Sequence, residues 1–197
     1  MQTEIEAKWL NIDKEALRKT LSDIGAELVS HERLMLRRTY DFPDGKLESV
    51  KGWVRVRNED DKITLSYKQL NDRAVHGTKE VTVIVNDFDS TCSFLESIGL
   101  VQKSVQETKR ESWRLGNAEI ELDTWPWIPS FVEIEAASEA ELITAAELLG
   151  LDYSKALHGS VETAYKAVYD VTEEEVNKWE EIRFTDVPLW LSSKKIK

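Results

Sequence analysis

The sequence has little cysteine and no long apolar segment. Cys92 is the only cysteine among 197 residues, so no internal disulfide can form, which fits a reducing compartment. No run reaches the roughly 18 apolar residues that span a bilayer. The start, Met1-Gln2-Thr3-Glu4, lacks the basic and apolar regions of a signal peptide. We therefore expect a cytoplasmic protein that has no membrane partner.

Histidine is also scarce, and acidic residues outnumber basic ones. The three histidines, His31, His76 and His158, are scattered and make no zinc-binding spacing. Lys and Arg number 26 against 37 Asp and Glu, which gives a formal net charge of −11. A negative protein is a poor general partner for nucleic acid or anionic membranes. An anionic small ligand is still compatible with this charge if basic residues are concentrated in one cavity.

Turn residues and apolar periodicity predict two successive units, each made of a strand, a helix and three more strands. Asp13 is the predicted N-cap of the first helix, which ends near Gly25, and Ser90 that of the second, which ends at Gly99. The shared order indicates a weak internal repeat. The predicted strands cover residues 2–10, 27–40, 52–59, 63–70, 78–86, 101–115, 117–125 and 130–137.

The rest of the chain is predicted to be helical. Capping boxes at Ser138 and Thr172 open the first and last of three helices. We expect residues 1–170 to form one domain and residues 171–197 a helical appendage with a basic tail. The apolar stripe of the appendage is too short to be stable alone, so it must dock on its own domain, over an opening, or on a second copy in a homodimer. The predicted helices cover residues 138–150, 160–168 and 172–183.

Charged and apolar residues alternate along the predicted strands. Glu4, Glu6 and Lys8 share one face of the first strand, and Arg55 and Arg57 share one face of another. A solvated face would accommodate such charges. Arg pairs and Glu pairs at alternate positions, and helices that need an apolar surface to cover, instead favour charges facing inward. Eight strands are enough to close a barrel. We therefore predict an α+β fold, a closed eight-stranded antiparallel β-barrel (tunnel) with a polar charged interior and helices packed outside.

Two strands carry short charged motifs, Glu4-Ile5-Glu6-Ala7-Lys8 and Arg55-Val56-Arg57. They resemble the ExExK motif and the RxR strand of the CYTH family, the triphosphate tunnel metalloenzymes, which are related to thiamine triphosphatase and class IV adenylate cyclase. The resemblance covers about residues 1–168. Further matching positions are Lys68, Glu80, Arg110, Leu122-Asp123, Phe131-Val132-Glu133-Ile134-Glu135 and Tyr165.

The resemblance implies a tunnel that binds a triphosphate-containing small molecule together with Mg²⁺ or Mn²⁺. Arginine and lysine suit phosphate oxygens, whereas hard divalent ions take carboxylate oxygens and water. The expected triphosphate-binding residues are Lys8, Arg55, Arg57, Lys68 and Arg110, with Glu80 holding a basic side chain in place. The expected metal ligands are Glu4, Glu6, Asp123, Glu133 and Glu135, with Glu121 lining the channel.

No histidine fits as a general base. We expect either a metal-bound hydroxide, or Glu4 or Glu6 accepting the proton. Lys68 near Tyr40 is a further candidate for activating water, although Tyr40 could equally be an ordinary strand residue.

Three functions stay open on the sequence. A metal-dependent triphosphatase would hydrolyse inorganic triphosphate, a nucleoside triphosphate or thiamine triphosphate, whereas an adenylate cyclase would direct a ribose hydroxyl at the α-phosphate. The cyclase branch usually has His-Phe and a Tyr before ExExK, and this chain begins Met1-Gln2-Thr3. A non-catalytic binder of polyphosphate or nucleotide would need the basic phosphate-binding residues more than the acidic metal-binding residues. We therefore favour a Mg²⁺- or Mn²⁺-dependent phosphoric anhydride hydrolase.

Overall fold

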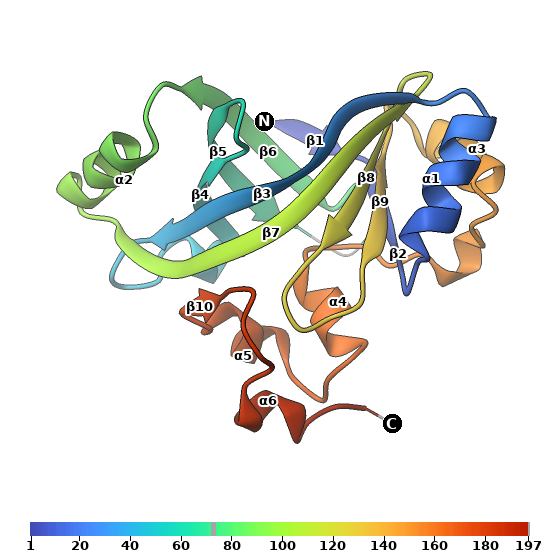
Figure 1. Ribbon diagram of the computed structural model, residues 1–197. Helices are drawn as coiled ribbons and strands as arrows, with labels where there is room; N and C mark the ends of the chain where they lie inside the picture. The colour runs from blue at the N-terminus through green and yellow to red at the C-terminus, as the bar shows by residue number, and fades with distance from the viewer. Residues whose placement is uncertain (72–73, 197) are drawn as a thin grey trace.

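The structure is organised around one curved β-sheet with helices at its sides and a C-terminal segment below it (Figure 1). The computed structural model describes residues 1–71 and 74–196, and within them ten strands follow the order β1-β6-β5-β4-β3-β7-β8-β9-β2, with β10 beside β7. All pairs are antiparallel except β10 with β7. The strands are β1 Gln2–Glu4, β2 Glu6–Leu10, β3 Glu27–Asp41, β4 Gly52–Asn58, β5 Ile63–Leu70, β6 Thr78–Val85, β7 Val101–Leu115, β8 Ala118–Thr124, β9 Phe131–Glu135 and β10 Glu181–Ile182.

The prediction of a closed eight-stranded barrel is wrong in closure and in strand number. The expected first strand is two strands, since β1 pairs with β6 and β2 pairs with β9. Ile5 stands between them, and its carbonyl accepts a hydrogen bond from the Ala136 N–H at 3.1 Å. The chain changes partner at this residue, so no continuous ladder joins the two ends of the sheet. The α+β class and the antiparallel sheet are confirmed.

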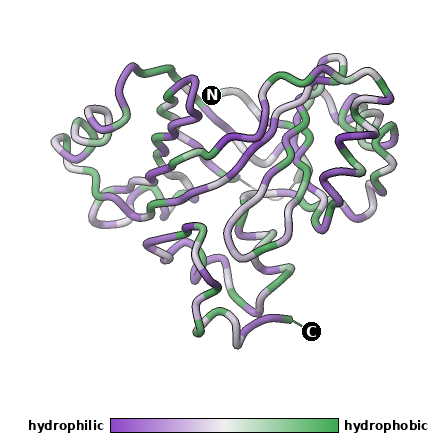
Figure 2. The backbone as a smooth tube through the Cα atoms, viewed as in Figure 1, coloured by the Kyte–Doolittle hydropathy of each residue, from purple (hydrophilic) through white to green (hydrophobic). Residues whose placement is uncertain are grey.

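Apolar side chains cover the outside of the sheet, as the alternation predicts. The outer face of β2, β8 and β9 packs on α1 and α3, and α2 covers parts of β3 and β4. Cys92 is a buried residue of α2 and belongs to the apolar cluster that contains Tyr40 and Val56. Polar and apolar residues alternate along the strands (Figure 2). The helices are α1 Lys14–Asp23, α2 Phe88–Ser97, α3 Glu139–Leu148, α4 Glu162–Lys166, α5 Glu173–Asn177 and α6 Leu189–Ser192, with 3₁₀ turns η1 Glu48–Val50 and η2 Tyr153–Lys155.

The helix caps agree with the sequence in part. Asp13 caps α1 by accepting a hydrogen bond from the Ala16 N–H at 3.1 Å. The predicted cap of α2 is wrong, because Asp87 fills that position and accepts from the Ser90 N–H at 2.6 Å. An Asp carboxylate is a strong N-cap and competes well with the serine that follows it. The capping box that opens α5 at Thr172 is confirmed.

The C-terminal segment is less helical than predicted. α5 ends at Asn177, and the chain then extends into β10, which runs parallel to β7. β8 pairs with β7 only from Lys109 onward, so the earlier part of β7 has free backbone groups on that side. The Glu180 carbonyl accepts a hydrogen bond from the Val105 N–H at 2.8 Å. Pairing with this open edge replaces the last turns of the expected helix.

A second apolar cluster joins the C-terminal segment to the sheet. Val176 and Ile182 are buried against Trp125, Phe131 and Tyr165. The segment therefore docks on its own domain. Among the described residues, no helix is long and apolar enough to cross a membrane.

Candidate active site

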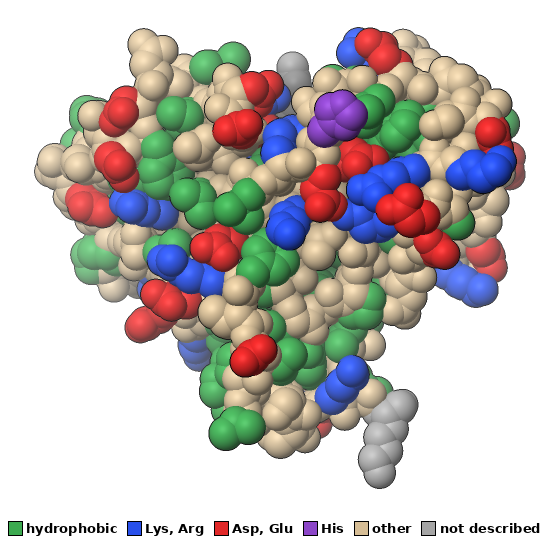
Figure 3. All heavy atoms as spheres, viewed as in Figure 1, with side chains coloured by type: hydrophobic (Ala, Val, Ile, Leu, Met, Phe, Trp, Pro, Cys, Tyr) green, Lys and Arg blue, Asp and Glu red, His purple; other side chains and the backbone are tan. Residues whose placement is uncertain are grey.

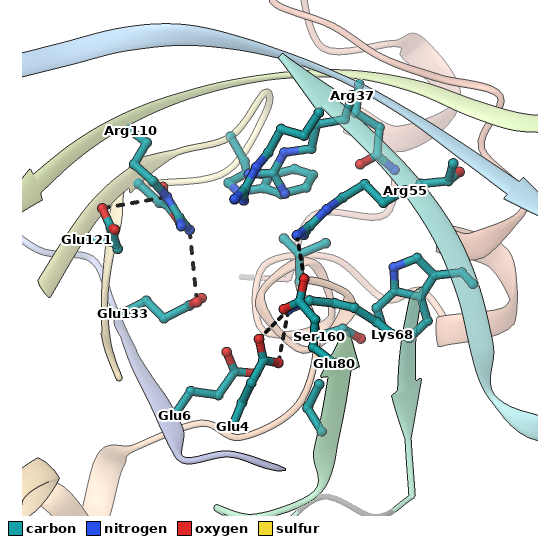
Figure 4. Close-up of a pocket in the computed structure, with 18 of the residues that line it drawn as sticks. Glu4, Glu6, Arg37, Arg55, Lys68, Glu80, Arg110, Glu121, Glu133 and Ser160 are labelled. Atoms are coloured by element: carbon teal, nitrogen blue, oxygen red, sulfur yellow. Dashed lines mark hydrogen bonds and ion pairs between the residues drawn. The ribbon is translucent and has the colours of Figure 1, made fainter. Parts of the chain in front are cut away.

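One cavity of about 880 Å³ lies inside the curved sheet. Charged side chains of the strands line it (Figure 4), and α5 and β10 contribute further lining residues. On the face seen in Figure 3, basic and acidic side chains lie next to one another. The cavity is lined by every charged residue that the sequence placed in the site, namely Glu4, Glu6, Lys8, Arg55, Arg57, Lys68, Glu80, Arg110, Glu121, Asp123, Glu133 and Glu135.

Lys68 and Arg55 form a hydrogen-bonded cluster with two carboxylates. The Lys68 Nζ donates to both oxygens of Glu4, at 2.9 and 3.0 Å, and lies 2.9 Å from an oxygen of Glu80. The Arg55 Nη2 donates to Glu80 at 3.3 Å. Glu80 therefore contacts both basic side chains. It lies directly opposite Lys68 in the pairing of β5 with β6.

Arg57 is held by a carboxylate that the sequence analysis missed. Its guanidinium lies 2.6 Å from an oxygen of Glu59, which is almost fully buried and is also approached by Arg33 at 3.7 Å. Burial, then repulsion from Arg55 and Arg110, lowers the pKa of Arg57 to about 10. Glu59 follows Arg55 and Arg57 at the same spacing of two residues, and this spacing could have indicated that Glu59 faces the cavity.

Arg110 and Asp123 form a bidentate ion pair. The Arg110 Nε donates to one oxygen of Asp123 at 2.7 Å, and its Nη2 donates to the other at 2.5 Å. Burial would lower the pKa of Arg110, but Asp123 and Glu121 raise it well above its ordinary value. Both oxygens of Asp123, the expected metal ligand, are thus engaged by an arginine.

The other carboxylates are crowded beyond what the nearby cations neutralise. Glu6 lies directly across the ladder from Glu135, an arrangement of like charges that destabilises a sheet. Burial, then Glu6 and Glu133, raises the pKa of Glu135 to about 7. Burial, then a hydrogen bond to Glu80, raises the pKa of Glu4 to about 8, and burial with Glu133 raises the pKa of Glu6.

This donor set fits a hard divalent cation. Four glutamates from β1, β2 and β9 face one cavity, and a cation between them would relieve the repulsion across the ladder. Among the described residues no group of three His, Cys, Asp or Glu is already arranged to hold a metal ion. The carboxylates have the right chemistry and would have to move together to share one ion.

Lys8 is tied to the protein on two sides. Its side chain is 2% exposed, its Nζ donates a hydrogen bond to the Gly159 carbonyl, and it lies 3.6 Å from Glu133. Burial would raise the pKa of Glu133, but Lys8 and Arg110 lower it to about 2. Lys8 therefore keeps Glu133 ionised and joins β2 to the segment before α4.

A family model for the CYTH domain matches residues 2–162 of the chain. The chain belongs to the CYTH domain family. The family expected from the sequence motifs is thereby confirmed. No curated protein matches the sequence.

Solved structures share the fold of this CYTH chain at low sequence identity. A putative adenylate cyclase from Vibrio parahaemolyticus has a TM-score of 0.73 and 17% identity, covering 84% of this chain and 98% of that one. The PH1012 protein from Pyrococcus horikoshii OT3 has a TM-score of 0.64 and 20% identity, over 78% and 93%. A putative adenylyl cyclase from Hippeastrum, described as having a dominant triphosphatase activity, has a TM-score of 0.55 and 15% identity, over 89% and 95%.

Tyr40 of this CYTH chain is directed away from Lys68. Its ring is fully buried with Val56 and Cys92, and its hydroxyl donates to Glu96 of α2 at 3.4 Å. Side chains alternate along β3, so the neighbours of Tyr40 in the chain face the cavity while its ring lies under α2. The expected pairing of Tyr40 with Lys68 in water activation is not formed.

Arg37 is a cavity residue that the sequence analysis missed. It is 6% exposed and lines the cavity, and its Nε and Nη2 have no hydrogen-bond partner. Burial, then Arg57, Arg55 and Arg110, lowers its pKa well below the ordinary value. The adjacent Arg38 faces α2 instead. Three apolar residues, Leu34, Met35 and Leu36, precede the two consecutive arginines, so the alternation does not indicate which arginine points inward.

Proposed function

We propose that this CYTH domain hydrolyses the terminal phosphoryl group of a triphosphate, using Mg²⁺ or Mn²⁺. The observation that carries the proposal is the pairing, in one cavity, of an arginine-rich wall with a set of glutamates whose pKa values are raised by burial and by neighbouring carboxylates. Polyanion and divalent cation would each neutralise one of these walls. The triphosphatase activity in the description of the Hippeastrum neighbour gives further support.

The basic wall supplies the contacts for phosphate oxygens. Arg55 and Arg57 lie two residues apart on β4, and Lys68 lies on the neighbouring strand β5. Each already makes a charge-assisted bond to a glutamate, and a phosphate oxygen would compete for the same donors. Arg110 is held by Asp123 in a fixed orientation, so it can present its remaining N–H groups to the substrate.

The acidic wall is the proposed cation site. Glu4, Glu6, Glu133 and Glu135 would hold the ion, which when bound neutralises phosphate charge and polarises a water molecule. Asp123 would act mainly by fixing Arg110.

The reaction itself needs one proton acceptor. A water oxygen attacks the terminal phosphorus, the bond between that phosphorus and the bridging oxygen breaks, and the shortened phosphate chain leaves with the bond electrons. Glu4 or Glu6 would accept the proton of the water.

Phosphate release tests the proposal directly. Inorganic triphosphate, ATP and thiamine triphosphate are each incubated with the protein in Mg²⁺ or Mn²⁺, and cyclic AMP is assayed in parallel. We expect phosphate from at least one substrate, loss of most activity in Glu6→Gln, and wild-type activity in the control Glu147→Gln, an exposed residue of α3. No phosphate from any substrate with either metal would contradict a hydrolase.

Adenylate cyclase is the second candidate, because Trp53 lines the cavity on the same strand as Arg55 and could lie against a nucleobase. Cyclic AMP with diphosphate as the product, instead of orthophosphate, would favour it. Binding of triphosphate without any product would identify a non-catalytic binder.

A further inference from the structure

Arg37 differs from the other arginines of the cavity in its contacts. Arg55, Arg57 and Arg110 each have a carboxylate within 3.3 Å, contributed by Glu80, Glu59 and Asp123. Among residues 1–71 and 74–196, no carboxylate forms an ion pair with Arg37, and its Nε and Nη2 are buried without an acceptor. A buried charge without a partner destabilises a fold unless something else binds it.

The guanidinium of Arg37 rests instead on an aromatic ring. Its Cζ lies 4.6 Å from the ring centroid of Trp125. A ring face stabilises a cation electrostatically, yet it uses none of the N–H donors. Trp125 is itself packed edge-on against Tyr165 of α4, whose hydroxyl donates to the Pro126 carbonyl at 2.9 Å. This support fixes Arg37 in place while its Nε and Nη2 have no hydrogen-bond acceptor.

The position of Arg37 relative to the other basic residues is set by register. Arg37 lies directly opposite Arg57 on β4, whereas Lys68 lies opposite Trp53, four residues earlier on the same strand. Arg55 lies between these two levels. Figure 4 shows Arg37 and Arg55 on one side of the cavity, and Glu4 and Glu6 across from them.

We propose that Arg37 is a specificity-determining residue that binds, together with Arg57, the phosphoryl group lying farthest from Lys68 and Glu4. Its free N–H groups have the bidentate geometry that phosphate oxygens accept. A chain of three phosphoryl groups reaches both levels of the basic wall, whereas orthophosphate occupies only one. Arg37 thus makes the cavity select triphosphate over shorter phosphates. The assignment rests on the proposed function, since it uses the same ligand.

Arg38 provides a matched control. It is the next residue of β3, but it points outward, where its guanidinium lies 5.2 Å from the ring of Phe88 and 3.4 Å from Asp89. Arg37→Met and Arg38→Met remove the same charge from opposite faces of one strand. Calorimetric titration of each variant with inorganic triphosphate, diphosphate and orthophosphate, without metal, compares them with the wild type.

We expect Arg37→Met to bind triphosphate about 10- to 100-fold more weakly, the usual loss for one charge-assisted contact. Its affinity for orthophosphate should change far less, and Arg38→Met should bind all three ligands as the wild type does. Melting curves without ligand should show Arg37→Met at least as stable as the wild type. If Arg37→Met does not fold, Arg37→Lys and Arg38→Lys carry the same comparison, with a several-fold loss for Arg37→Lys because the planar fork is gone.

Two failures are distinguishable. If the wild type binds triphosphate and Arg37→Met binds it equally tightly, or loses all three ligands to the same extent, the assignment of Arg37 is overturned and the proposed function stands. If the wild type binds no triphosphate and releases no phosphate from it, both are overturned.

Discussion

Glu135→Gln tests whether the acidic wall is charged beyond what the fold can neutralise. Glu135 faces Glu6 across the ladder between β2 and β9, and its pKa is raised to about 7 from an ordinary 4.5. A raised pKa means that the native state binds the proton more tightly than the unfolded state. The stabilising contribution of Glu135 is therefore complete below pH 4.5 and is lost as the pH rises through 7.

The size of the effect follows from the shift. One pKa unit corresponds to about 1.4 kcal/mol, so between pH 5 and pH 8 the free energy of unfolding should fall by about 2–3 kcal/mol because of Glu135 alone. Glutamine has no charge to develop, so Glu135→Gln should lack this part of the fall. At pH 8, without metal, the variant should be more stable than the wild type by about that amount.

Urea unfolding at pH 5 and pH 8 in the presence of a chelator measures this difference. Glu147→Gln, on the exposed face of α3, is the control and should follow the wild-type pH dependence. Added Mg²⁺ should stabilise the wild type at pH 8 more than the variant, because a ligand that binds only the native state shifts unfolding by mass action. The reasoning is refuted if Glu135→Gln and the wild type lose the same free energy between the two pH values.

Three more outcomes are expected. Asp123→Asn removes the charged partner of the buried Arg110 and should destabilise the protein by about 3–5 kcal/mol in urea unfolding; an unchanged midpoint would show that Glu121 and Glu133 suffice. Arg57→Ala should weaken triphosphate binding more than orthophosphate binding in calorimetry, and equal losses would mean that the side chain serves only the fold. Ile182→Ala should cost about 2–4 kcal/mol with no change in the mass measured by light scattering, whereas conversion of a dimer to a monomer would place the C-terminal segment at an interface between copies.

Period-two alternation was enough to predict which faces of the strands carry the site. Arg55 and Arg57 alternate with valines, and Glu133 and Glu135 alternate with apolar residues that pack under the helices. Each of these strands has only one face that can be buried against a helix, so the inward set follows. Arg37 escaped because Arg38 follows it and the alternation is lost at that point.

Non-local pairing could not be predicted in the same way. The exchange of partners at Ile5 depends on where β6 and β9 end, and these ends are distant in the sequence. The shortening of the last helix likewise depends on the free edge of β7 near Val105. A helical pattern in the segment itself gives no information about an edge elsewhere that competes for its backbone.

The exchange of partners at Ile5 has a consequence for the two glutamates beside it. Glu4 is fixed by hydrogen bonding of β1 to β6, and Glu6 by hydrogen bonding of β2 to β9. Their carboxylates therefore belong to opposite ends of the strand order, which Ile5 joins through the chain. An ion held by both would cross-link these edges, so amide hydrogen exchange in β1 and β2 would slow together when Mg²⁺ is added. Binding of the metal ion and cross-linking of the two edges of the sheet would then be a single event.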